Sequence, residues 1–121
     1  MIVGSGCDIL SIRRVESLLR YNKFLDKYFT GNEICMFNNQ KNKKNYVKKI
    51  ASNLCVKEAF FKSISHKFKK FSFKDIEVLR DKDGRPYLRL LNSLKEFINI
   101  NINVTISNER DYVISFIILE I

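Results

Sequence analysis

The spacing of apolar residues changes along the chain between a two-residue and a helical period, and these changes mark the expected elements. Residues 2–10 predict a short strand with small residues at its centre. Ser11 can cap a helix that runs to about residue 22. The apolar positions of this helix recur at helical spacing: Ile12, Val15, Leu18 and Leu19. Thr30-Gly31-Asn32-Glu33 has the spacing of a capping box, which predicts a second, short helix.

The second half of the chain begins with polar residues 40–45, which predict a loop. Apolar residues then sustain a helical period from Tyr46 to about His66, the longest expected helix. The remaining elements are expected in this order: a hairpin of strands at 71–80 and 86–91 joined by a turn at 81–84, a helix at 93–100, and strands at 103–107 and 112–121 joined by a turn at 108–111. This order predicts an α+β fold with an antiparallel sheet and the long helix packed against it.

The length of 121 residues predicts a single domain, residues 1–121. The 45% of hydrophobic residues suffices for one core, and the length leaves no room for a second. The last expected strand, residues 112–121, is apolar on both faces. An exposed apolar strand is an aggregation hazard, so either helices or another subunit must cover it. We expect self-association.

Composition excludes several classes of protein. No apolar run approaches the roughly 18 residues that span a bilayer, and the N-terminus lacks a secretory signal pattern, so no membrane partner is expected. Cys7, Cys35 and Cys55 are far apart, with only His66 to assist them. This excludes a zinc finger or a disulfide scaffold and favours a reducing compartment.

The positive charge is concentrated in one segment. Residues 41–70 hold ten Lys and a single acid, Glu58, a balance that equals the net charge of +9 of the whole chain. A localised field of this kind predicts an anionic partner. The alternative is a solvated lysine-rich helix face.

Two acidic residues are candidates for chemistry in this setting. Asp8 lies toward the end of the first expected strand. Glu58 and Lys62 are one helical turn apart and project from nearly the same face, where a helix-stabilising ion pair is the alternative interpretation. Two carboxylates that converge beside lysines would suit a divalent cation and a phosphate ester, because magnesium prefers carboxylate and phosphate oxygens.

Four motifs resemble those of the holo-acyl-carrier-protein synthases. Residues 6–16, GCDILSIRRVE, are similar to the family's N-terminal G-x-D-[IV]-x-x-I-x-R-[IV]-E motif, and residues 56–62, VKEAFFK, resemble its K-E-A-x-x-K helix motif. Phe29-Thr30 with Glu33 is similar to F-[LT]-x-x-E, and Gly84-Arg85-Pro86 sits where the family has G-x-P. The resemblance covers essentially the whole chain.

The resemblance implies a magnesium-dependent phosphopantetheinyl transferase. Such an enzyme moves 4′-phosphopantetheine from coenzyme A to a serine of apo-acyl carrier protein, releasing adenosine 3′,5′-bisphosphate, in support of fatty acid biosynthesis. Asp8 and Glu58 would hold the metal, and Lys62 would complete the catalytic set by contacting phosphate. Either a carboxylate or a water on the metal would remove the serine proton. The lysines that bind the 3′-phosphate stay unassigned within the basic segment.

The resemblance also implies partners. Arg14 matches the family's arginine on the first helix, whose basic face docks the acidic helix of acyl carrier protein, with Arg13 and Arg20 as helpers. The family's homotrimer has active sites between subunits, and its strands complete a barrel-like core, which would cover the apolar last strand. The expected location is the cytoplasm, or an organelle stroma if a presequence has been removed.

Two segments depart from the family pattern. The glycine-containing phosphate loop is replaced by Ser65-His66-Lys67, so the side chains of Ser65 and Lys67 are candidates for phosphate contacts. The family's H-V-[ST]-[IL]-x-[HD] strand reads NVTISN at residues 103–108. Asn103 and Thr105 are expected to contact coenzyme A, because asparagine still donates a hydrogen bond although it cannot act as an acid or base. Lys48 and Asn53 stand where basic residues are frequent, and the second has no charge.

Two alternatives come from other classes of protein. A non-catalytic trimeric scaffold of the same fold would account for the two asparagines and the missing glycine loop. A small nucleic-acid-binding domain would account for the sequence pI of about 9.6, but no stacking motif or G-x-x-G signature accompanies the lysines, so no nucleic-acid partner is expected. Retention of Asp8, Glu58 and Lys62 together favours the transferase.

Overall fold

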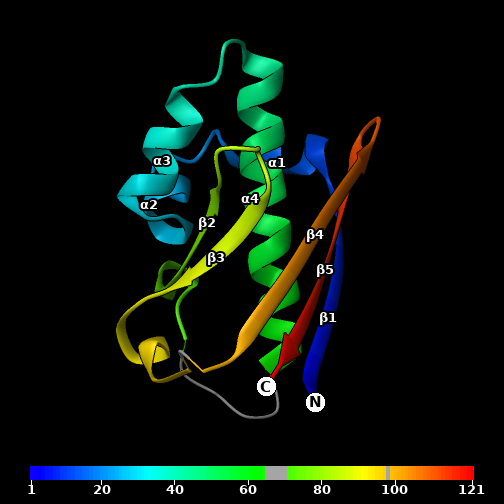
Figure 1. The fold of residues 1–121 in the computed structure, drawn as a ribbon. Helices are drawn as coiled ribbons and strands as arrows, with labels where there is room; N and C mark the ends of the chain where they lie inside the picture. Colours follow the sequence, from blue (N-terminus) through cyan, green and yellow to red (C-terminus); the bar gives the residue numbers. More distant parts are fainter. Residues whose placement is uncertain (65–70, 98) are drawn as a thin grey trace.

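The computed structural model describes residues 1–64, 71–97 and 99–121, and these form five strands, four α-helices and two 3-10 helices (Figure 1). In chain order they are β1 (Ile2–Ser11), α1 (Ile12–Leu18), α2 (Phe24–Tyr28), α3 (Gly31–Asn38), α4 (Lys43–Ile64), η1 (Phe73–Asp75), β2 (Ile76–Arg80), β3 (Pro86–Leu90), η2 (Asn92–Phe97), β4 (Asn101–Glu109) and β5 (Tyr112–Glu120). The α+β class expected from the sequence is confirmed. No helix in the described ranges has the length and apolar character needed to cross a bilayer.

The strands form two separate antiparallel sheets. β1, β5 and β4 lie in that order in a three-stranded sheet, and β2 and β3 form a hairpin. The chain ends lie side by side, because Met1 and Ile121 exchange backbone hydrogen bonds of 2.7 and 2.9 Å (Figure 1). In this register Asp8 is opposite Ser115, and Cys7 is opposite Phe116. The strand that carries Asp8 is thus held by the last strand of the chain.

The long helix α4 packs along the inner face of the three-stranded sheet, and two glycines of β1 set how closely it does so (Figure 1). A Cβ at Gly6 would overlap the carbonyl oxygen of Ala59, and a Cβ at Gly4 would lie 2.5 Å from the carbonyl oxygen of Ser63. Glycine therefore brings the backbone of β1 directly against the backbone of α4. The same helix supplies apolar residues to both clusters of the core: Ile50 and Leu54 to one, Val56 and Phe60 to the other.

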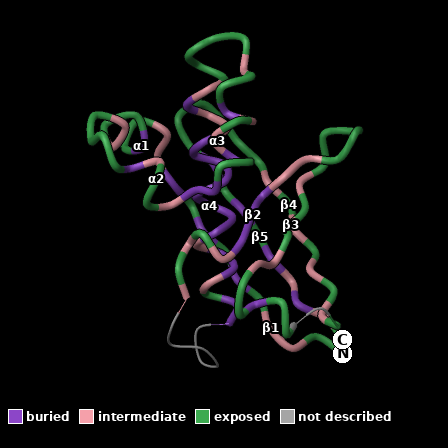
Figure 2. Tube along the Cα trace, turned by 90° about the vertical axis from the view of Figure 1, so that its left-hand side faces the viewer, coloured by how far each residue is buried: buried purple, intermediate pink, exposed green. Residues whose placement is uncertain are grey.

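Buried residues gather around α4, β2 and β5 in the middle of the molecule, whereas the loops at its periphery are exposed (Figure 2). The three-stranded sheet has a buried face against α4 and an exposed outer face. Along β5, alternate residues from Val113 to Leu119 are buried. Between them Ile114 and Phe116 remain 42% and 41% exposed, and Ile9, which pairs with Ile114, is 64% exposed. Ile9, Ile114 and Phe116 define what we call the outer apolar face. The expected apolar character of both faces is confirmed, and within one chain only one face is covered.

The side-chain caps expected from the sequence are present. Ser11 Oγ accepts a hydrogen bond of 3.4 Å from the backbone N–H of Arg14 at the start of α1. Thr30 and Glu33 form both hydrogen bonds of a capping box at α3. α4 begins at Lys43, three residues before the expected Tyr46, and its expected end near His66 lies outside the described residues.

Other element boundaries differ from expectation. α1 ends at Leu18 rather than near residue 22, because Leu19 packs against the core from the turn that follows, which prolongs the apolar period without prolonging the helix. Residues 73–75 form a 3-10 helix capped by Ser72 instead of the start of a strand. Residues 92–97 also form a 3-10 helix, where an α-helix was expected. The sequence did not predict α2, whose five residues are too few for a periodic signal.

Replacement of Gly6 by alanine is expected to lower the free energy of unfolding by about 2 kcal/mol or more, the usual cost of overpacking a core. The added methyl group meets the backbone of α4, which cannot move aside as a side chain would. Urea unfolding followed by circular dichroism measures the change. Gly31→Ala is the matched control, because nothing lies within 4 Å of its Cβ position in the first turn of α3. Equal unfolding midpoints for the two variants would contradict the role assigned to Gly6.

Candidate active site

Three of the residues expected to carry chemistry meet where β1 lies against α4. Asp8 is buried on the inner face of β1, and Glu58 and Lys62 come from successive turns of α4. Lys62 Nζ lies 2.9 Å from Asp8 Oδ1 and donates a second hydrogen bond, of 3.0 Å, to the carbonyl oxygen of Cys7. The expected convergence of Asp8, Glu58 and Lys62 is therefore present within one chain.

The two carboxylates of this site place like charges together in a partly buried position. Burial, and then the neighbouring Asp8, raise the pKa of Glu58 to about 7, while the charges of Arg14 and Lys62 oppose the rise. The Oδ2 atom of Asp8 is buried and has no hydrogen-bond partner among the described residues. A buried acceptor without a donor costs free energy. A cation beside the two carboxylates would relieve both the repulsion and the missing contact.

Magnesium fits this donor set. It takes oxygen ligands and is commonly held by one or two carboxylates, with water and substrate phosphates completing its shell. Within the described part of the chain, no group of three or more His, Cys, Asp or Glu side chains is arranged to hold a metal ion. Asp8 and Glu58 thus suit a metal that shares its shell with a phosphate-bearing substrate, in contrast to a closed structural site.

A buried cysteine and a buried serine fix the backbone of β1 at Asp8. The Cys55 thiol lies 3.3 Å from the carbonyl oxygen of Asp8 and 3.6 Å from that of Val113, and Ser115 Oγ donates a hydrogen bond of 2.9 Å to the carbonyl oxygen of Cys55. Burial raises the pKa of the Cys55 thiol to about 12. Cys55 is therefore a neutral donor that fixes the backbone of β1 to α4, and it is not a nucleophile.

The structure does not bring Asn103 and Thr105 to this site within one chain. Both are exposed on β4, and Thr105 pairs with Phe116, which in turn is opposite Cys7. They lie on the outer face of the sheet, whereas Asp8 lies on the inner face. The other two residues expected to bind phosphate, Ser65 and Lys67, lie outside the described residues.

The three arginines expected to dock a partner point to two different places. Arg14 lies near enough to Glu58 for its charge to lower the pKa of that carboxyl group. Arg13 Nε lies 3.9 Å from Asp111 Oδ2, and together with Arg20 it lines a cavity of about 610 Å³. Arg14 thus lies near the cluster of Asp8, Glu58 and Lys62, whereas Arg13 and Arg20 line a separate cavity together with Lys43 and one acid, Glu16.

A further basic cavity, of about 430 Å³, lies between α4, the hairpin and the end of β4. Lys48, Lys49 and Arg80 line it without an acidic residue. Burial and the charges of Arg80 and Lys48 lower the pKa of Lys49, so the cations repel one another and would attract an anion. The sequence indicated Lys48 at this place but not Arg80. The guanidinium of Arg80 donates a hydrogen bond of 3.0 Å to Oδ1 of Asn53, which is uncharged at a helix position where the family often has a basic residue.

We expect a thiol reagent at about pH 8 to modify the exposed Cys7 and Cys35 of the native protein and to leave Cys55 unmodified, because the thiolate is the reactive form. Intact-protein mass spectrometry should therefore show two added groups on the wild-type protein and on Cys55→Ser, and one on Cys35→Ser. All three thiols of the wild-type protein should react in urea, which is the control for reagent access. Fast labelling of Cys55 in the native protein would contradict its role as a buried donor.

Comparisons with known proteins bear on this geometry. Residues 4–117 match the 4′-phosphopantetheinyl transferase superfamily. The holo-[acyl-carrier-protein] synthase of Clostridium beijerinckii is 37% identical over 124 residues, which cover 99% of this chain and 98% of the relative. The crystal structure of the holo-ACP-synthase from Plasmodium yoelii superposes with a TM-score of 0.82 at 27% identity and covers 98% of this chain and 94% of its own.

A holo-(acyl-carrier-protein) synthase from Bacillus anthracis, solved in complex with CoA (3′,5′-ADP), superposes with a TM-score of 0.77 at 30% identity. That alignment covers 99% of this chain and 97% of the other. These likenesses extend over the whole chain, so they confirm the resemblance first indicated by the four short motifs. This chain belongs to the 4′-phosphopantetheinyl transferase superfamily.

Proposed function

We propose that this protein transfers the 4′-phosphopantetheine group of coenzyme A to a serine of apo-acyl carrier protein, with release of adenosine 3′,5′-bisphosphate, in support of fatty acid biosynthesis. The observation that carries the proposal is the meeting of Asp8, Glu58 and Lys62 where β1 lies against α4. Support also comes from the full-length similarity to holo-[acyl-carrier-protein] synthases and from the Bacillus anthracis structure with CoA (3′,5′-ADP).

In this proposal each group of the site has one role. Asp8 and Glu58 hold a magnesium ion, which when bound supplies positive charge to the pyrophosphate of coenzyme A. Lys62, whose side chain is 58% exposed, adds a second positive charge within reach of a phosphate oxygen. Phosphoryl transfer depends mainly on positioning and charge neutralisation. The ion pair with Asp8 also serves the reaction, because it fixes where the Lys62 charge lies.

The phosphate on the ribose of coenzyme A requires cations of its own. We assign it to the cavity of Lys48, Lys49 and Arg80, where three cations face one space without an acid. Arg80 replaces at this place the charge that Asn53 lacks. Ser65 and Lys67, which lie outside the described residues, follow Lys62 in the sequence, and we assign them to phosphate contacts as well.

The carrier protein is assigned to the basic surface of α1. Arg14 lies at the edge of the catalytic site, and Arg13 and Arg20 extend the positive surface beside it. An acidic helix would be attracted to such a surface over a distance. Attraction of this kind raises the association rate and weakens with salt.

A homotrimer would use the outer apolar face. Ile9, Ile114 and Phe116 expose apolar area that a single chain leaves uncovered, and larger apolar patches mark protein contacts. Asn103 and Thr105 on the same side of the sheet would then contact coenzyme A bound at a neighbouring chain. Strands of three copies would surround a shared, barrel-like core.

The cytoplasm is the location that we assign to this reaction. Cys7, Cys35 and Cys55 are all unpaired, which suits a reducing compartment.

Incubation with coenzyme A, magnesium and an apo-acyl carrier protein is expected to add one phosphopantetheine to the carrier, detected by intact-protein mass spectrometry. A chelator should abolish the addition. Asp8→Asn and Glu58→Gln should each lower kcat/KM by about a hundredfold or more, because loss of a carboxylate ligand removes several kcal/mol of charge stabilisation.

The control for these variants is Asp26→Asn, which makes the same chemical change at an exposed carboxylate of α2 and should leave the rate unchanged. The proposal would be contradicted by transfer that persists with chelator, or by Asp8→Asn and Glu58→Gln variants that are as active as this control. If the wild-type protein fails with several carriers, the non-catalytic scaffold takes its place.

Light scattering is expected to give a mass near three times the 14.3 kDa of one chain. Phe116→Lys should reduce it, because a charge in the outer apolar face cannot be buried without a partner. Tyr87→Lys is the matched control, since Tyr87 on β3 is 44% exposed but lies in the other sheet. A wild-type mass of one chain, or equal masses for both variants, would contradict the trimer.

A further inference from the structure

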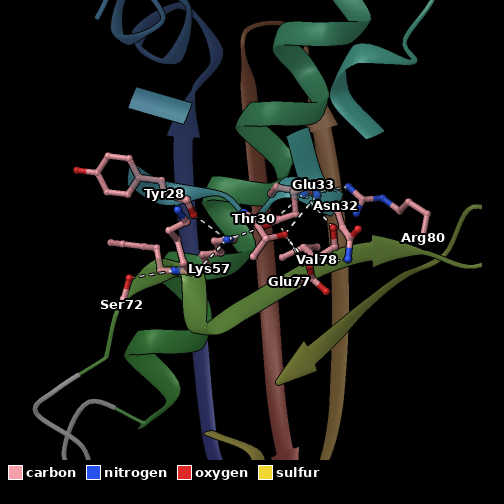
Figure 3. Close-up of polar contacts among 12 residues, drawn as sticks. Tyr28, Thr30, Asn32, Glu33, Lys57, Ser72, Glu77, Val78 and Arg80 are labelled. Atoms are coloured by element: carbon pink, nitrogen blue, oxygen red, sulfur yellow. Dashed lines mark hydrogen bonds and ion pairs between the residues drawn. The ribbon is translucent and has the colours of Figure 1, made fainter. Parts of the chain in front are cut away.

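A fully buried ion pair lies on α4 next to the catalytic carboxylate, and the reaction described above does not use it. Glu33 of α3 and Lys57 of α4 have no exposed side-chain area, and Lys57 Nζ lies 2.5 Å from Glu33 Oε1 (Figure 3). Glu77, Asn53 and Arg80 surround the pair. The sequence indicated Glu33 as a capping residue and Lys57 as the neighbour of Glu58, each within a motif that resembles the family's, and it did not indicate that the two residues pair.

The carboxylate of Glu33 binds two successive turns of α4. Oε1 accepts from Lys57, and Oε2 accepts a hydrogen bond of 2.9 Å from Asn53 Nδ2, four residues earlier on the helix. The backbone N–H groups of Thr30, the N-cap of α3, and of Val78 in β2 donate to the same carboxylate, at 3.2 and 3.3 Å. One carboxylate, anchored outside α4, therefore fixes the helix against both rotation and sliding.

Lys57 is equally constrained. Besides Glu33, its ammonium group donates hydrogen bonds of 2.8 Å to the carbonyl oxygens of Tyr28 and Phe73, which accounts for all three of its protons. Consecutive residues of an α-helix project about 100° apart. A fixed direction for Lys57 therefore fixes the direction in which the next residue, Glu58, leaves the helix.

Stability alone is a weak reason for such a pair. Two charges lose much of their hydration when they are fully buried, and well-packed apolar residues of similar size often serve stability equally well. An apolar pair would not fix the orientation of α4, because apolar packing permits small rotations of a helix about its axis. The carboxylate of Glu33, whose two oxygens accept hydrogen bonds from two residues of α4, does not permit them. The pair therefore contributes mainly to the orientation of α4, and through it to the direction of Glu58, the residue next to Lys57.

We propose that Glu33 and Lys57 are positioning residues that set the rotation of α4 and thereby hold Glu58 against Asp8. The inference rests on the proposed function in one respect, namely that Glu58 and Asp8 bind a metal ion. Glycines 4 and 6 hold α4 from the side of β1. The buried pair holds it from the side of α3 and the hairpin, so that neither contact alone determines the direction of Glu58.

The experiment replaces the pair by neutral side chains of similar size, in Glu33→Gln/Lys57→Met. Changing both residues leaves no buried charge without a partner, so the variant is expected to fold. Mn²⁺, which takes the same oxygen ligands as magnesium, is titrated by calorimetry into the protein without coenzyme A. We expect its affinity to fall about tenfold or more, as when residues that orient metal ligands are changed. Thermal unfolding is recorded in parallel.

Glu77→Gln is the matched control. Glu77 is also buried, with 3% exposed, but it accepts its hydrogen bonds from Thr30, the N-cap of α3, and from Asn32 of that helix, at 2.6 and 3.0 Å. The control should lose stability and keep the Mn²⁺ affinity of the wild-type protein. A purely structural role would lower affinity in both variants in proportion to their loss of stability, and that result would overturn the proposal.

The remaining outcomes separate this inference from the proposed function. A folded double variant with wild-type Mn²⁺ affinity overturns the positioning role and leaves the transfer reaction in place. Wild-type protein that binds Mn²⁺ through Asp8 and Glu58, as tested with Asp8→Asn, but transfers nothing overturns the proposed function alone. Wild-type protein whose Mn²⁺ affinity is insensitive to Asp8→Asn overturns both.

Discussion

The contact between the backbones of β1 and α4 is the constraint on which the rest of the structure depends. Gly4 and Gly6 leave no side-chain layer between strand and helix, and they meet the turns of Ala59 and Ser63. The residues just before these on the helix are Glu58 and Lys62. Asp8, two residues after Gly6 on the same face of the strand, is thereby carried to both of them. The approach of Asp8 to the helix therefore depends on the absence of a Cβ atom at both glycines.

Charged groups on α4 are arranged in two opposite ways within one turn of each other. At Lys57 every donor of the ammonium group and both oxygens of Glu33 are used, and the ion pair opposes the effect of burial, which raises the pKa of Glu33 and lowers the pKa of Lys57. At Glu58 the neighbouring carboxylate adds to the effect of burial, and Asp8 Oδ2 has no partner among the described residues. A polar cluster in which every donor and acceptor has a partner forms a rigid framework. A cluster with an unpaired acceptor and two neighbouring carboxylates is stabilised when a cation binds.

Local patterns predicted most of the elements and the convergence of Asp8, Glu58 and Lys62. Contacts distant in sequence account for most of what these patterns missed. The capping box at Thr30 and Glu33 was readable because both partners lie within four residues. The second role of Glu33 was not, since Lys57 lies 24 residues away. Likewise the sequence places Arg80 at the end of a strand, and its contact with Asn53 arises only in the folded chain. The 3-10 helices were not predicted, because hydrophobic periodicity needs more residues than these short segments have.

The pairing of β1 with β5 also governs when the site can form. Asp8 belongs to the first strand, and its partner Ser115 lies in the last, with the whole chain between them. Closing so long a loop is unfavourable until other contacts stabilise it, and folds rich in such distant pairings fold slowly. A chain emerging from the ribosome presents β1 long before β5, so Asp8 takes its place only after β5 has been synthesised. Until then β1 is an unpaired strand.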